Sequence, residues 1–159
     1  MTTELEARVA ALWAKDQIRE LRHRYHQAVN EMDIEGIVAL FAEDAELDFG
    51  YLGRTRGREK IGQFFGSMPD LLPFIKQFIH NHIVTLDDDG EHGQGVSYME
   101  AKTISDGQAF FVSGRYDDTY VLTDAGWRFA EMVFDPYFSV PFQEGWAAEQ
   151  RLQMGYGQD

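Results

Sequence analysis

The N-terminal part of the chain places apolar residues at the three- and four-residue spacing of amphipathic helices. Thr3 and Glu6 have capping-box spacing, which predicts a short first helix. Asp16 can cap a second helix. The apolar face of that second helix consists of Ile18, Leu21, Tyr25, Val29 and Met32. Asp33 can cap a third helix that ends near Phe41. Three consecutive helices are therefore predicted.

The rest of the chain reads mainly as β-strand. A strand is expected over residues 45–52, and the glycines that follow mark a loop around a small helix over 58–66. Turn sequences such as "DDDGE", "DG" and "TDAG" separate four long strands, over 74–86, 93–105, 108–122 and 127–134. Sequential hairpins form an antiparallel meander. The pattern predicts an α+β fold in which a curved antiparallel sheet wraps over N-terminal helices.

The length of 159 residues fits a single domain over 1–159, with a core over about 10–135. The C-terminal segment 136–159 begins with a Pro- and Gly-containing aromatic stretch, and we expect it to form a flap over a pocket mouth. The chain has no cysteine, which excludes disulfides and thiol chemistry. Its 12 Phe, 7 Tyr and 3 Trp either fill a large core or line an apolar pocket.

Charge and hydropathy limit the possible partners. A net charge of −13, spread along the chain, repels phosphate backbones, so no nucleic-acid partner is expected. The start of the chain lacks the layout of a secretory signal, and no apolar run reaches the length of a membrane span. We therefore expect a cytoplasmic protein that does not bind membranes.

Four stretches carry a resemblance to a known family: "IRELRHRYHQAVNEMDIEGIVALFAEDAELDF", "GREKIGQFF", "NHIVTLDDDG" and "SGRYDDTYVLTDAGWRF". From about residue 10 to residue 135 the chain resembles the SnoaL-like branch of the nuclear-transport-factor-two-like superfamily. That branch includes scytalone dehydratase, hexachlorocyclohexane dehydrochlorinase and polyketide cyclases. The resemblance implies a cone-shaped α+β barrel around a deep apolar cavity.

The resemblance also implies where acid/base residues belong. Dehydratase-like members pair an aspartate near the end of the second helix with a histidine at the start of the first long strand. The ungapped register places Asn30 and Gln77 at these positions. A second register places His80 at the histidine position, and a β-bulge could realise it. Strand alternation puts His80 and His82 on one face and Gln77 on the other.

The candidate site follows from these two registers. The resemblance implies that His80 is the acid/base group and that Asn30 assists it, since an amide can orient a substrate but cannot exchange protons near neutral pH. Family pattern and strand parity add the substrate-binding candidates Tyr25, His26, Phe49, Gln77, Tyr98 and Tyr116. No cofactor is expected. The "HNH" sequence lacks a third metal ligand, so no metal site is expected either.

Three functions remain open. The first is a cofactor-independent lyase, isomerase or cyclase that acts on an apolar cyclic or aromatic molecule by proton abstraction followed by elimination or rearrangement. The second is a non-catalytic member that binds an apolar ligand, because Asn30 and Gln77 replace the family's Asp/His dyad. The third is a structural subunit like the small subunit of ring-hydroxylating dioxygenases. An open curved sheet leaves one face to cover, so a homodimer or homotrimer is expected.

Overall fold

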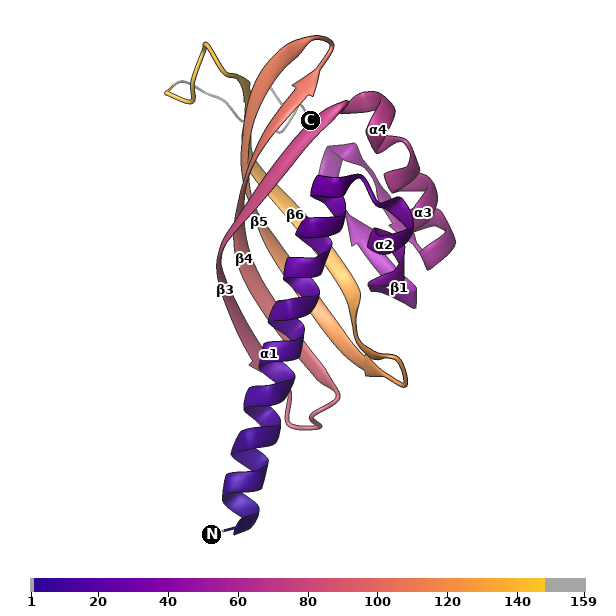
Figure 1. The fold of residues 1–159 in the computed structure, drawn as a ribbon, viewed down its shortest axis with the longest axis vertical. Coiled ribbons are helices and arrows are strands. Elements are labelled where there is room, and N and C mark those ends of the chain that lie inside the picture. Colours follow the sequence, from indigo (N-terminus) through magenta and orange to yellow (C-terminus); the bar gives the residue numbers. More distant parts are fainter. Residues whose placement is uncertain (1, 148–159) are drawn as a thin grey trace.

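The computed structural model describes residues 2–147, in which helices pack against one large curved sheet (Figure 1). The helices are α1 (Thr2–Glu31), α2 (Ile34–Ala39), α3 (Arg58–Gly66) and α4 (Met68–Leu71), and a short 3-10 helix, η1, spans Gly50–Leu52. The strands are β1 (Phe41–Asp48), β2 (Arg54–Arg56), β3 (Phe74–Leu86), β4 (His92–Ser105), β5 (Gln108–Thr123) and β6 (Gly126–Pro141). The predicted α+β class is confirmed.

The sheet is mixed and open. Its strand order is β2-β1-β6-β5-β4-β3. Strands β3 to β6 form the predicted antiparallel meander. Strand β1, however, lies parallel to β6, with Leu47 opposite Met132. The predicted antiparallel sheet therefore contains one parallel pair, because β1 joins the sheet beside β6, at the opposite end of the meander from β3.

A single helix of 30 residues replaces the two helices predicted before Asp33. Asp16 lies inside α1, where no glycine or proline interrupts the run of good helix formers around it. The helix ends at Met32, whose φ of 58° is left-handed. Asp33 then caps α2 as predicted, since its side chain accepts a hydrogen bond from the Gly36 backbone N–H at 2.9 Å.

Strand β6 is longer than predicted and includes the first part of the expected flap. It continues to Pro141, which pairs with Phe110 of β5. Pairing with β1 stops at Val133, so beyond it β6 is an edge strand in which a proline leaves no ladder partner unsatisfied. Residues 136–141 of the predicted flap are therefore part of the sheet, and its last residues, 148–159, lie outside the described part of the chain.

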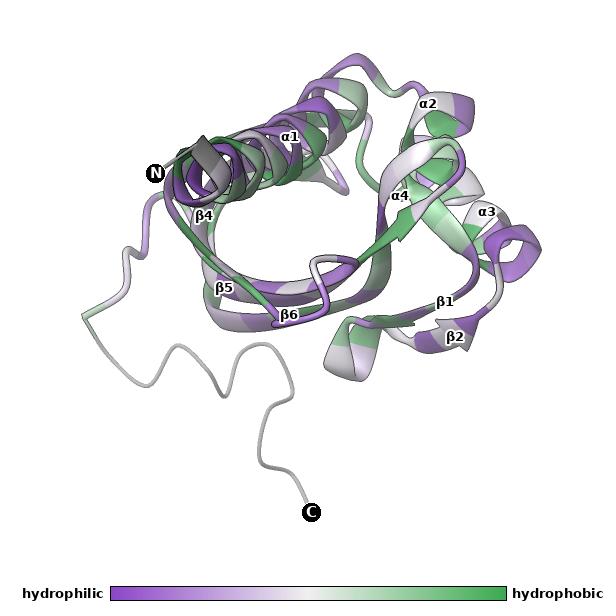
Figure 2. Cartoon of the chain, turned by 90° about the horizontal axis from the view of Figure 1, so that it is seen from below, coloured by the Kyte–Doolittle hydropathy of each residue, from purple (hydrophilic) through white to green (hydrophobic). Residues whose placement is uncertain are grey.

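The concave face of the sheet is covered by α1 on one side and by α2, α3 and α4 on the other (Figure 2). The core between them is rich in aromatic rings. The Tyr25 ring lies 5.9 to 6.4 Å from the rings of Phe41, Phe65, Tyr116 and Phe129. Among residues 2–147, no helix is long and apolar enough to cross a membrane.

Candidate functional site

A pocket of about 290 Å³ lies between the sheet and helices α1, α3 and α4. Most of its wall is apolar, with contributions from Val29, Phe49, Phe65, Ile75, Met99 and Phe134. Its polar lining residues are Tyr25, Tyr51, Ser67, Gln77, Thr103, Tyr116 and Ser139. No carboxylate or imidazole belongs to this lining among the residues described. The pocket is therefore apolar, with hydroxyl and amide groups as its polar features.

Tyr25 and Tyr116 are the most buried polar residues of the lining, followed by Thr103 and Gln77. Tyr25 and Tyr116 are each 1% exposed, and their side chains are hydrogen-bonded to each other. Burial raises the pKa of Tyr116 to about 12, and burial also raises the pKa of Tyr25. Both hydroxyls keep their protons at neutral pH. Because the bond between them uses one of the two protons, the pair can donate one hydrogen bond to a bound oxygen atom.

His26 lies directly behind this lining. Its Nδ1 atom is 2.7 Å from the Gln77 Oε1 atom, which can only accept a hydrogen bond, so Nδ1 carries the proton. Burial, followed by the charge of Arg22, lowers the pKa of His26 to about 3, although the Gln77 hydrogen bond opposes the shift. The ring is neutral at pH 7. Its Nε2 atom is buried and has no hydrogen-bond partner among the described residues.

Asn30 joins α1 to β3 and does not line the pocket. Its amide nitrogen donates to the Gln77 carbonyl at 2.9 Å, and its Oδ1 atom accepts from the Gln77 backbone N–H at 2.6 Å. The structure thus brings together the two residues of the ungapped register. Both polar groups of the Asn30 side chain are hydrogen-bonded to the backbone of β3, so Asn30 has a structural role that connects α1 to the sheet.

A β-bulge separates the two strand histidines. Ile79 pairs with Met99 and His82 pairs with Ser97, so two β3 residues oppose the single Tyr98. The expectation that His80 and His82 share a face is therefore wrong. The His82 Nε2 atom lies 3.0 Å from the Tyr120 hydroxyl on the inner side, and burial lowers the pKa of His82 to about 4.

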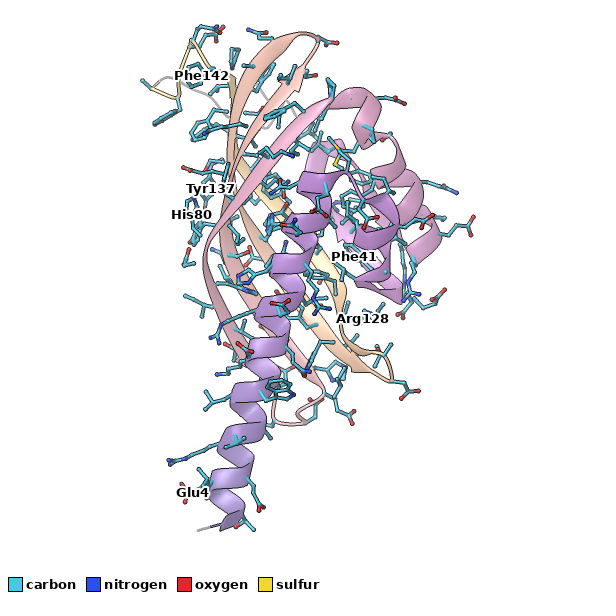
Figure 3. The ribbon with its side chains drawn as sticks, in the orientation of Figure 1. Glu4, Phe41, His80, Arg128, Tyr137 and Phe142 are labelled. Carbon is cyan, nitrogen blue, oxygen red and sulfur yellow. The ribbon has the colours of Figure 1, made fainter. Side chains whose placement is uncertain are left out.

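His80 lies on the outer side of the sheet, away from α1 (Figure 3). Its side chain is 51% exposed, its Nε2 atom is 3.3 Å from the Glu100 carboxylate, and it is not part of the pocket lining. The expected position of His80 in the cavity is wrong, because regular alternation from the lining residue Gln77 carries His80 to the outer face, and the bulge turns only the later His82 inward.

The remaining predicted binding residues divide in the same way. Phe49 lines the pocket together with Tyr25, Gln77 and Tyr116. Tyr98 does not: its ring lies 6.3 Å from that of Tyr137 on the outer face. Its neighbour Met99 lines the pocket, and adjacent strand residues point to opposite faces. The prediction that Tyr98 lines the pocket is wrong, and the adjacent Met99 lines it instead.

A buried charged network below the pocket was missed by the sequence analysis. Arg22 donates to the Asp118 carboxylate, and both side chains are 0% exposed. The Tyr120 hydroxyl donates to the same carboxylate at 2.9 Å and joins the network to His82. Arg22 follows Ile18 by four residues and precedes Tyr25 by three, so helical spacing alone could have placed it on the core face.

Comparison with known proteins identifies the family of the chain. Residues 10–133 match the family model of the SnoaL-like domain. An uncharacterized protein of Mycobacterium tuberculosis is 27% identical over 127 residues, which cover 79% of this chain and 86% of that protein.

Solved structures share the fold at lower identity. A hexachlorocyclohexane dehydrochlorinase, LinA-type3, from Novosphingobium barchaimii has a TM-score of 0.77 at 14% identity, over 84% of this chain and 92% of that chain. A scytalone dehydratase-like protein from Novosphingobium aromaticivorans has a TM-score of 0.77 at 17% identity, over 84% of this chain and 90% of that chain.

Proposed function

The chain belongs to the SnoaL-like domain family, and from that premise we propose that it binds an apolar cyclic or aromatic molecule that carries an oxygen atom. The composition of the pocket supports this function. A ring system would be buried against the aromatic and aliphatic wall. The oxygen atom would accept a hydrogen bond from Tyr116 or Tyr25, whose hydroxyls remain protonated at neutral pH.

The observation that carries the proposal is the absence of a base in the lining described above. Proton abstraction is efficient when the base has a pKa near the working pH. The nearest imidazole, His26, has a pKa of about 3, so it holds a proton weakly. Asn30 and Gln77, at the positions implied for the family dyad, do not exchange protons near neutral pH. The pocket is better suited to bind and polarise an oxygen than to abstract a proton.

Binding can be tested with two molecules of nearly the same shape, 2-naphthol and 2-methylnaphthalene. We expect the protein to bind 2-naphthol more tightly by about three- to tenfold, the effect of one hydrogen bond. The Tyr116→Phe variant should lose most of that preference while it still binds 2-methylnaphthalene. Titration calorimetry measures all four affinities. If neither compound binds, or if Tyr116→Phe leaves the preference unchanged, the proposal is wrong.

A second candidate is a lyase or isomerase of the dehydratase type, and the buried Nε2 atom of His26 favours it. With the proton held on Nδ1 by Gln77, the Nε2 lone pair is free to accept one. His26 would then take the acid/base role predicted for His80. The test is deuterium exchange at the α-carbons of 2-tetralone in D₂O, followed by NMR. Exchange above the background rate that disappears in His26→Gln supports catalysis, and exchange at the background rate rejects it for this ketone.

A further inference from the structure

The mouth of the pocket carries large apolar side chains that are exposed. Tyr51 and Leu52 of η1 are 50% and 51% exposed, and Leu71 of α4 is 63% exposed, yet all three belong to the same lining as the buried Tyr25 and Tyr116. The apolar wall therefore continues from the interior to the protein surface. We call Tyr51, Leu52 and Leu71 the apolar rim.

The backbone holds the η1 part of the rim in place. The Phe49 backbone N–H donates to the Gly53 carbonyl at 2.9 Å, which closes the turn that presents Tyr51 and Leu52. Gly53 has a φ of 137°, and a Cβ atom there would lie 3.3 Å from the Phe64 ring. This conformation and this close approach both favour glycine. The η1 part of the rim is thus positioned by an ordered turn packed against α3.

The size of the pocket sets a limit on what it can enclose. A volume of about 290 Å³ lies at the lower end of the range of about 300–1,000 Å³ for small-molecule sites. Such a space suits a compact ring system. A larger ligand would have to leave through the mouth, where the first surfaces it meets are apolar.

We propose that the ligand is an amphiphile, with an oxygenated ring held at Tyr116 and Tyr25 and an apolar chain that crosses the apolar rim. This inference rests on the proposed function and specifies its ligand class. Burying an exposed leucine against an alkyl chain removes apolar surface of both partners from water. A purely polar extension of the ring would leave Leu52 and Leu71 exposed and would gain nothing from them.

A series of 4-alkylphenols from 4-methylphenol to 4-hexylphenol tests the inference by titration calorimetry. In the wild-type protein, each methylene that reaches the rim should tighten binding by about fourfold. The double variant Leu52→Ser and Leu71→Ser should lose the gain in affinity per added methylene for the longer chains, and this gain is compared within each protein relative to its own affinity for 4-methylphenol. The matched control replaces Leu5 and Leu12 by serine, since both are exposed to a similar extent on α1 outside the lining and should leave the series unchanged.

The possible results distinguish a failure of the amphiphile inference from a failure of the proposed binding function. If 4-methylphenol binds and longer chains bind no more tightly, or gain equally in the rim variant, the amphiphile is rejected and the proposed function stands. If no member of the series binds, both are rejected. If the rim variant changes the sedimentation behaviour of the protein and leaves the gain per methylene intact, the rim contacts a second copy of the chain and the inference is wrong.

Discussion

Arg22 of α1 and Asp118 of β5 form an ion pair with both side chains fully buried. The Arg22 guanidinium also lies 4.2 Å from the centre of the Tyr116 ring. Burial by itself lowers the pKa of Arg22. Asp118 and the neighbouring tyrosines raise it by more, so the pKa of Arg22 lies above its ordinary value. Burial raises the pKa of Asp118, while Arg22 and Tyr120 oppose that shift. The pair fixes α1 against the sheet below the pocket.

Removing one partner of this pair should be strongly destabilising. Asp118→Asn leaves the Arg22 charge buried without a counter-ion, and we expect a loss of about 3–5 kcal/mol in the free energy of unfolding. Urea denaturation followed by circular dichroism measures it. The matched control is Asp117→Asn on the outer face, where the carboxylate is 45% exposed beside Arg115 and should contribute less than about 1 kcal/mol. Equal losses in the two variants would contradict the role of burial.

The buried histidines should make stability fall below neutral pH. His26 has a folded pKa of about 3 against about 6.5 when unfolded, so between these values the unfolded chain binds the extra proton. Above pH 6.5 the ring is neutral in both states and the free energy of unfolding does not depend on its titration. As the pH falls below 6.5, the free energy of unfolding decreases. The free energy of unfolding should change by up to about 1.4 kcal/mol per pH unit for His26, and by less for the part-exposed His82.

Urea denaturation at pH 7 and pH 5 measures this dependence. The variant His26→Gln should show a smaller loss of stability between the two pH values than the wild-type protein, because one proton-binding difference has been removed. An identical loss in both proteins would show that His26 does not titrate differently in the folded and unfolded states.

Gly95 keeps space for the polar network below the pocket. A Cβ atom at this position would lie 2.7 Å from the Tyr120 hydroxyl and 2.8 Å from the His82 Nε2 atom. We expect Gly95→Ala to cost about 1–3 kcal/mol through overpacking, measured by thermal unfolding. Gly66→Ala is the control, since a Cβ there meets no atom within 4 Å and should leave stability unchanged or raise it slightly.

Asn30 should contribute to stability more than to binding. Asn30→Ala leaves the backbone N–H and C=O of Gln77 without their partner, which should cost about 1–3 kcal/mol of unfolding free energy. The exposed Asn81 on the same strand provides the control, and Asn81→Ala should have little effect. A variant Asn30→Ala that is as stable as the wild type but fails to bind 2-naphthol would instead place Asn30 at the ligand.

His80→Ala should bind 2-naphthol with the wild-type affinity, because His80 lies on the outer face beside Glu100. Gln77→Ala, which alters the pocket lining, should weaken binding by about three- to tenfold. Fluorescence titration with 2-naphthol measures both. If His80→Ala lowered the affinity for 2-naphthol tenfold or more, His80 would contribute to the binding site.

Much of the fold was predictable because it depends on neighbouring residues. The apolar spacing of α1, the Asp33 cap, α3 and the hairpin turns of β3 to β6 all follow from the local sequence. The position of Tyr116 in the pocket agrees with strand parity, because alternation holds wherever a strand is regular, and that of Phe49 agrees with the family resemblance. Parity left open whether Gln77 or the strand histidines face inward.

The sequence by itself determined the α+β class, the family and the aromatic character of the pocket, since periodicity and motif spacing are properties of contiguous residues. Only the tertiary structure decided which side His80, His82 and Tyr98 take, because parity alone does not say which face of a strand packs on the helices, and the bulge between Ile79 and His82 puts the two histidines on opposite faces. It also decided the pairing of Arg22 with Asp118, 96 residues away. Such a contact forms when α1 packs on β5, and its register depends on the whole core.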